Sequence, residues 1–210
     1  MNRSICACVL GMVWSVAALA QSTDLAPDAQ ARKVTEEVLA IIRADKDIQA
    51  GNTQKILDLV EAKVLPHFNF TRMTRLAVGA PWRQASSAQQ QSLTSEFRTL
   101  LVHTYTSAFT QYRDQVVEYK PLKLQAGDTD VVVRSLVKQK GGADPIDINY
   151  SMEKTDASWK VYDVTIAGVS LVQNYRSTFS SEIQKSGIDG LIATLATKNK
   201  TLSQHQAAKK

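Results

Sequence analysis

Apolar residues recur every three or four positions through the first half of the chain, a period that predicts helices with one buried face. Three short stripes cover residues 34–42, 56–64 and 68–76. A longer stripe covers residues 93–112 and carries a large apolar or aromatic side chain at nearly every turn. We therefore expect three amphipathic helices followed by one long helix of about six turns.

After Asp114 the period shortens to two, which predicts β-strands with alternating faces. Four strands are expected, over residues 117–119, 131–133, 146–152 and 159–166. The segments between them are rich in glycine, aspartate and serine and are too short to contain a crossover helix. Successive strands should therefore pair as an antiparallel meander, in a sheet of four or slightly more strands.

Two more amphipathic segments follow the strands, at residues 171–179 and 188–195, with Gly187 between them. From Asn199 onward the chain is polar, and we expect residues 199–210 to form a frayed tail. The order of helices, strands and helices predicts an α+β fold in which helices pack on an antiparallel sheet.

Side chains that can cap helices precede several of these stripes. Asn52 or Thr53 can cap the second helix, and residues 86–90 offer two overlapping capping boxes for the long one. Ser170 and Gln173 form the same pattern after the last strand. These caps support the expected helix starts independently of the apolar periodicity.

Residues 1–20 have the pattern of a secretory signal peptide. Arg3 provides a short basic start, an apolar run follows, and Ala18-Leu19-Ala20 is a typical cleavage sequence. A membrane anchor is the alternative, but the apolar run is shorter than the ~20 residues that a spanning helix needs. We expect cleavage after Ala20, export of the mature chain, and one domain over residues 21–198.

Composition limits the chemistry of the exported part. The two cysteines of the chain, Cys6 and Cys8, both lie in the expected signal peptide, so the rest has neither disulfides nor a thiolate metal site. At 44% hydrophobic residues the chain can bury a core but is not a multi-span membrane protein. It has 25 Lys and Arg against 20 Asp and Glu. Because an exported protein does not meet nucleic acid, anionic lipid head groups or envelope proteins are the expected acidic partners.

No convincing active site is found in the sequence. His67, His103 and His205 are not spaced with other ligands as in a metal site. Ser170 follows a strand, as in a nucleophile elbow, but no acid and histidine can be assigned to it, and helix capping explains it better. Asp163 lies in an apolar strand and is expected to be a structural, hydrogen-bonded carboxylate. An enzyme is therefore not expected, and no cofactor is predicted.

The large apolar side chains on the long helix and the strands allow two interpretations. They can fill a core, or a curved sheet facing helices can enclose a cavity for an apolar ligand. From the residues alone, a filled core is favoured, because such stripes usually mean packing.

Two parts of the chain resemble the MlaC family, also called toluene-tolerance proteins. The C-terminal part consists of residues 159–179, with Gly-Val-Ser-Leu-Val-Gln-Asn-Tyr-Arg at its centre, followed by residues 187–192. The N-terminal part consists of residues 67–73 and Gly-Ala-Pro-Trp at 79–82. Asn69 stands where the family often has aspartate. The resemblance extends from about Val34 to Leu195.

This resemblance implies a periplasmic phospholipid carrier with phospholipid as its cargo. Such a carrier shuttles lipid between an outer-membrane lipoprotein–porin complex and an inner-membrane ABC transporter with an MCE-domain subunit, and so maintains outer-membrane lipid asymmetry. The fold implied is a mixed one with a deep apolar cavity, similar in outline to cystatin-like or NTF2-like proteins. With the resemblance, the cavity replaces the filled core as the expected arrangement.

We expect the cavity wall to come from the inward strand faces and from two of the helices. A one-residue shift in register would exchange the two faces of a strand. The alternatives to a lipid carrier are an NTF2-like enzyme with a cavity and an adaptor that binds proteins without lipid. The expected lipid-binding residues are Phe70, Met73, Leu101, Tyr105, Phe109, Val117, Tyr119, Val131, Val133, Ile146, Ile148, Tyr150, Met152, Val164 and Ile166.

Overall fold

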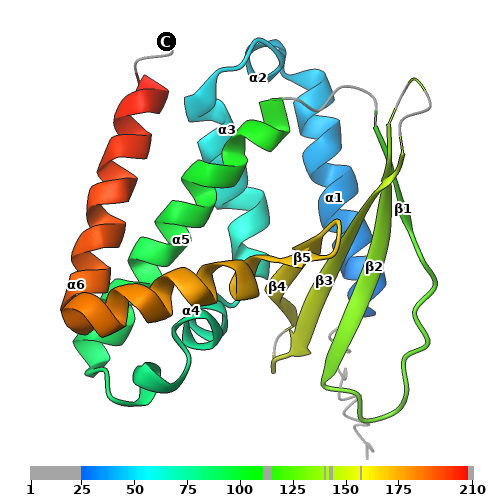
Figure 1. Cartoon of the computed structure of the whole chain (residues 1–210). Helices are drawn as coiled ribbons and strands as arrows, with labels where there is room; N and C mark the ends of the chain where they lie inside the picture. Colours follow the sequence, from blue (N-terminus) through cyan, green and yellow to red (C-terminus); the bar gives the residue numbers. More distant parts are fainter. Residues whose placement is uncertain (1–24, 111–114, 140, 142–143, 157, 208–210) are drawn as a thin grey trace, which may run out of the picture.

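A computed structural model describes residues 25–110, 115–139, 141, 144–156 and 158–207. Helices precede and follow one antiparallel sheet, as expected for an α+β fold (Figure 1). The export signal expected at residues 1–20 lies outside the described residues. The elements are α1 Pro27–Ala44, α2 Lys46–Gln49, α3 Thr53–Leu59, η1 Val60–Val64, η2 Leu65–His67, α4 Phe70–Val78, η3 Ala80–Arg83, α5 Ser87–Thr110, β1 Val116–Tyr119, β2 Asp130–Lys138, β3 Ile146–Lys154, β4 Trp159–Ile166, β5 Val169–Ser170 and α6 Leu171–Ala207.

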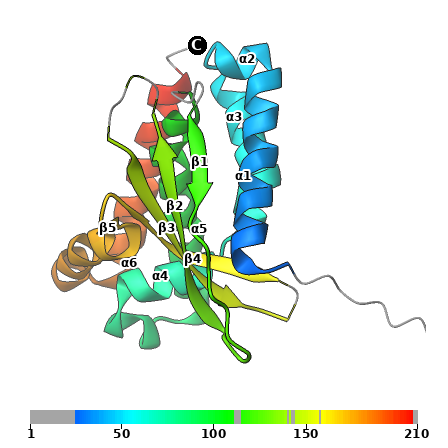
Figure 2. The same ribbon diagram turned by 90° about the vertical axis from the view of Figure 1, so that its right-hand side faces the viewer.

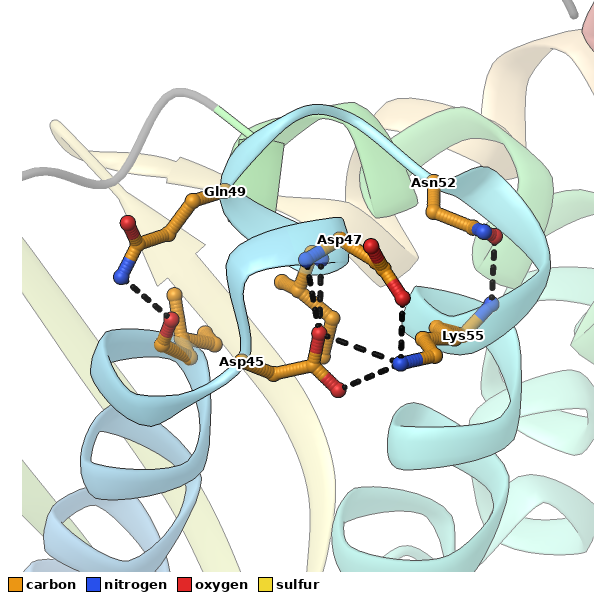
Figure 3. Close-up of polar contacts among 7 residues, drawn as sticks. Asp45, Asp47, Gln49, Asn52 and Lys55 are labelled. Carbon is orange, nitrogen blue, oxygen red and sulfur yellow. Dashed lines mark hydrogen bonds and ion pairs between the residues drawn. The ribbon is translucent and has the colours of Figure 1, made fainter.

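The N-terminal helices α1 and α3 are joined through the short helix α2 by a set of side-chain caps (Figure 3). Asp45 accepts hydrogen bonds from the backbone N–H groups of Asp47 and Ile48, which begins α2. Lys55 on α3 donates to Asp45 at 3.0 Å and lies 2.7 Å from the carboxylate of Asp47. Asn52 caps α3, as the sequence predicts. These contacts fix the turn that folds α3 back along α1.

The second predicted helix is α-helical only in its first half. After Leu59 the chain forms the π-helical segment η1 and then the 3₁₀ turn η2, which contains Pro66. Short π segments are rare in α-helices and often occur at functional sites. Here η1 and η2 turn Val64 and Leu65 toward the inside of the molecule, where both reach the cavity described below.

The sheet is the expected antiparallel meander, with the order β1-β2-β3-β4-β5. The fifth strand, β5, has two residues; a sheet slightly larger than four strands was expected, but the position of this strand was not predicted. Val133 pairs with Tyr150, and Tyr150 pairs with Val164, so these three side chains share a face. This face is turned toward α1 and α5, and its buried residues form one hydrophobic cluster around Trp159 (Figures 1 and 2).

A second hydrophobic cluster joins α4, α5 and α6. Phe97 of α5 lies edge-on against Phe179 of α6, with ring centroids 5.0 Å apart, and both are buried. Ser86 and Gln89 form the predicted reciprocal capping box at the start of α5. The cluster gives the long helix one fixed position behind the sheet.

Helix α6 consists of two arms that meet at Gly187, as the sequence predicts (Figure 1). Gly187 has φ 73° and ψ −174°, a backbone conformation that a side chain would strain. The expectation of a frayed tail from Asn199 is wrong, because α6 continues to Ala207. Asn199 is buried, and its amide donates to Glu96 of α5, while Gln206 bonds to His103. The polar character of residues 199–207 gave no sign that their side chains bond to α5.

Candidate lipid-binding cavity

A cavity of about 390 Å³ lies between the inner face of the sheet and a wall of helices. The sheet provides one side, and α1, η1, η2, α4 and α5 provide the other. Most of the lining is aliphatic or aromatic. The size is within the range of small-molecule sites, and an apolar lining of this extent suits an apolar ligand.

Helix α1 contributes more of the wall than any sequence pattern indicated. Val34, Val38 and Leu39 face the cavity from α1, with Val60 opposite them on η1. Val38 is also part of the cluster that packs α1 on α3. Periodicity identified the apolar side of this helix, but it could not say whether that side faces a cavity or a filled core.

A β-bulge sets which residues of β4 face the cavity. Ser151 pairs with Asp163 and Met152 pairs with Val161, so Tyr162 is the extra residue in β4. The bulge allows Val161 and Val164, three positions apart, to face the same side. Counted from Val161, a strict period of two would have placed Asp163 on the cavity face. Instead, Asp163 accepts hydrogen bonds from Ser170 and from the backbone of Val172 at the start of α6, in the structural role that the sequence predicts.

Most of the predicted lining residues lie on the cavity wall, although their contact with lipid stays a prediction. Three of the others are on the correct face but away from the wall: Val133 is fully buried among sheet residues, Val131 packs in the same cluster, and Ile146 lies at the end of β3. The Phe109 side chain is outside the described part of the structure. Those on the wall are Phe70, Met73, Leu101, Tyr105, Val117, Tyr119, Ile148, Tyr150, Met152, Val164 and Ile166.

Several wall residues were not predicted. The amphipathic pattern of residues 34–42 could have identified the wall residues of α1. Val137 lies on β2 and continues the alternation of Val131 and Val133 toward the end of that strand. The stripe at residues 56–64 also marked Val60 and Val64 of η1 as apolar, but it could not show that the π segment turns them toward a cavity. The wall residues that sequence reasoning missed are Gln30, Ala31, Val34, Thr35, Val38, Leu39, Val60, Val64, Leu65, His67, Phe68, Val102, Thr106, Val137, Val161 and Leu171.

Three tyrosines, Tyr105, Tyr119 and Tyr150, lie on this largely apolar wall. The hydroxyl of Tyr119 lies 2.6 Å from that of Thr35 on α1 and donates to the carbonyl of Ala31 at 3.1 Å. Burial raises the pKa of Tyr119, and burial also raises the pKa of Tyr150, followed by the effect of neighbouring Tyr119. Both phenols are therefore neutral hydrogen-bonding groups, and the contact with Thr35 joins β1 to α1.

His67 is the one histidine on the cavity wall among the described residues. Its Nδ1 lies 3.5 Å from the side-chain nitrogen of Gln30, whose amide in turn bonds to the backbone of Trp159. Burial, and then the charge of Lys160, lower the pKa of His67. The imidazole is therefore neutral near pH 7.

A polar cluster on the outer face of the sheet holds α4 in place. Arg72 contacts Glu153 at 2.6 Å and Asp130 at 2.7 Å, and its guanidinium lies 3.5 Å from the ring centroid of Tyr162. Asn69 caps α4 and donates from its amide to Glu153 at 2.6 Å. An aspartate at position 69 could cap the helix but could not donate to Glu153. The cluster fixes α4, which presents Phe70 and Met73 to the cavity.

The described residues contain no group of three or more His, Cys, Asp or Glu side chains arranged for a metal ion. Within the same residues, none of the helices has the length and apolar character needed to cross a membrane. The site is thus an apolar cavity with a few neutral polar groups at its wall.

An antiparallel sheet closed by helices around such a cavity defines a protein of the apolar-ligand-binding class. The comparison with known families gives the specific assignment. Residues 32–197 match the model of the family described as MlaC protein, so the chain belongs to the MlaC family.

Three relatives support this assignment. The chain is 29% identical over 164 residues to the intermembrane phospholipid transport system binding protein MlaC of Haemophilus influenzae, covering 72% of this chain and 76% of that protein. It is 23% identical over 156 residues to the toluene tolerance protein ttg2D of Pseudomonas putida, covering 74% and 72%. A phospholipid-binding protein from Ralstonia solanacearum, solved in complex with a phospholipid, is 40% identical, with a TM-score of 0.78 over 84% of this chain and 98% of that one.

Proposed function

We propose that this protein binds a phospholipid in the cavity between the sheet and α1 and carries it through the periplasm. The observation that carries the proposal is the apolar wall, formed by residues such as Ile148, Val164 and Leu101. A structural relative that holds a phospholipid and shares 40% of its sequence with this chain supports the choice of ligand.

The energetics explain why a carrier is needed. Each buried methylene contributes about 0.8 kcal/mol, so moving two acyl chains into water costs on the order of 20 kcal/mol. Free diffusion of a phospholipid across an aqueous compartment is therefore negligible. A cavity that encloses the acyl chains removes this barrier while the protein diffuses.

The same energy prevents spontaneous release, so unloading needs a partner that opens the cavity or continues its apolar surface. We propose two such partners, an outer-membrane lipoprotein–porin complex and an inner-membrane ABC transporter with an MCE-domain subunit. Family membership supports this assignment, as does the relative described as part of an intermembrane phospholipid transport system. The export pattern of residues 1–20 supports a periplasmic location. Transport of this kind would maintain the lipid asymmetry of the outer membrane.

Lipid extraction tests the proposal. The protein is purified from the periplasm without detergent, extracted with organic solvent, and the extract is analysed by mass spectrometry. We expect phospholipid in near-stoichiometric amount. Protein that is folded but free of phospholipid, and that takes up none from vesicles, would contradict the proposal and favour an adaptor that binds proteins alone.

A further inference from the structure

Two methionines carry all the sulfur of residues 21–210. The other two methionines of the chain, Met1 and Met12, lie in the expected signal peptide together with both cysteines. The remaining pair lines the cavity, Met73 from α4 and Met152 from β3. All the oxidisable sulfur beyond residue 20 is therefore at the wall of the space proposed for the lipid.

The two methionines reach the same part of the wall from different elements. Met152 pairs with Val161 of β4. The backbone N–H of Asn69, which caps α4, donates to the carbonyl of Val161 at 2.8 Å. Met73 lies one turn further along α4, and its N–H donates to the carbonyl of Asn69 at 3.0 Å. Both methionines are therefore close to the point where α4 meets β4 (Figures 1 and 2).

Packing shields both methionines from the surrounding water. Each residue is 1% exposed. Met73 belongs to the cluster that joins α4, α5 and α6, and Met152 belongs to the cluster around Trp159. An oxidant dissolved in water therefore has almost no access to either side chain, whereas a molecule in the cavity lies against the wall that both help to form.

The chemistry of the thioether distinguishes these two side chains from the rest of the apolar wall. Leucine and methionine exchange in protein cores at little cost, so packing alone does not require sulfur at either position. Methionine sulfur is polarizable and is oxidised to a sulfoxide, a reaction that aliphatic side chains do not undergo. An unsaturated acyl chain that has been oxidised carries a hydroperoxide within its apolar part. The bound lipid itself can thus bring an oxidant to the shielded sulfur.

We propose that Met73 and Met152 reduce acyl hydroperoxides of the bound phospholipid to alcohols and are themselves oxidised to methionine sulfoxide. The sulfur attacks the outer oxygen of the hydroperoxide, and the O–O bond breaks. The outer oxygen stays on the sulfur, and the inner oxygen takes up the proton and becomes the hydroxyl of the lipid alcohol. The peroxide gains the two electrons that the sulfur loses. This inference rests on the proposed binding of phospholipid in the cavity.

Mass spectrometry of the oxidised residues tests the proposal, with a surface methionine as an internal control. Leu124 is 45% exposed between β1 and β2, so Leu124→Met supplies a methionine that meets water. This protein is loaded from vesicles of palmitoyl-linoleoyl-phosphatidylglycerol in which part of the lipid is the linoleoyl hydroperoxide. A second sample is loaded from unoxidised vesicles and then receives the same amount of hydrogen peroxide. Sulfoxide at each position, bound phospholipid and remaining hydroperoxide are measured.

With the lipid hydroperoxide, positions 73 and 152 should be oxidised at least about tenfold faster than position 124, because a bound reactant has a much higher effective concentration than a dissolved one. With hydrogen peroxide the order should reverse, because position 124 is the exposed one. Lipid alcohol should appear in the same amount as the sulfoxide at positions 73 and 152. The reversal separates an oxidant carried by the lipid from one that arrives through water.

Replacing both sulfur atoms provides the second readout. Met73→Leu combined with Met152→Leu should prevent formation of the lipid alcohol, expressed per phospholipid bound so that a change in uptake is counted separately. Bound hydroperoxide that leaves positions 73 and 152 unoxidised, or oxidises position 124 equally fast, overturns the proposal while phospholipid binding stands. Alcohol formed equally by the double variant also overturns it. If the protein takes up no phospholipid from either kind of vesicle, the proposed carrier function fails as well.

Discussion

A carboxylate in the middle of the cavity wall should abolish lipid binding without unfolding the protein. Ile148 lies on β3, is half-buried and faces the cavity. In Ile148→Glu the carboxylate would be hydrated in a lipid-free cavity but would lose that hydration against acyl chains. The effective cost of burying one such charge is several kcal/mol, and about 3 kcal/mol already corresponds to a more than hundredfold loss of affinity.

The matched control is Val132→Glu, on the neighbouring strand β2. Val132 is 43% exposed on the opposite face of the sheet, so its carboxylate meets water in both states. Both variants are compared with wild type by circular dichroism, thermal unfolding and quantification of co-purified phospholipid. Lipid should be lost from Ile148→Glu alone. A folded Ile148→Glu protein with wild-type lipid content would refute the assignment of this wall, and Val137→Glu repeats the test if Ile148→Glu does not fold.

Three further predictions concern stability. Arg72→Ala should lower the free energy of unfolding by about 2 kcal/mol, because it removes two charge-assisted hydrogen bonds from a largely buried guanidinium. Arg75 lies on the same helix but is exposed, so Arg75→Ala should change the free energy of unfolding by less than about 0.5 kcal/mol. Equal values for Arg72→Ala and Arg75→Ala in chemical denaturation would contradict the stabilising role of the Arg72 cluster. Gly187→Ala should cost about 1–2 kcal/mol because φ is 73° there, and an unchanged midpoint of thermal unfolding would count against that strain. Burial and the charge of Lys160 hold the pKa of His67 below 6.5, so the unfolded chain takes up a proton more readily than the folded protein. Wild type should therefore lose stability as the pH falls from about 7 to 5.5. His67→Gln should flatten this dependence of stability on pH, and an identical profile would show that His67 does not contribute to it.

The sequence predicted the element types well where local chemistry decides them. The capping box of Ser86 and Gln89 begins α5, Asn52 begins α3, and Gly187 divides α6 as expected. The alternation in the strands gave the correct face for Ile148. In each case the signal lies within a few residues of the feature it predicts.

The errors occurred where distant segments decide the outcome. Asn199 was assigned to a frayed tail, but it is buried against Glu96, more than a hundred positions away in the chain. The apolar side of α1 was recognised, yet its place in the cavity wall depends on the sheet that it faces. Val133 was placed correctly on the inner face, but neighbouring side chains cover it. Whether an apolar residue fills a core or borders a cavity is a property of the packed structure.

The most direct test of the account is a crystal structure of the protein purified with its endogenous ligand. We predict continuous electron density for acyl chains between α1 and the sheet, in contact with Ile148, Tyr150 and Met73. A structure in which side chains close this space, or in which phospholipid is bound elsewhere on the protein, would contradict the central claim.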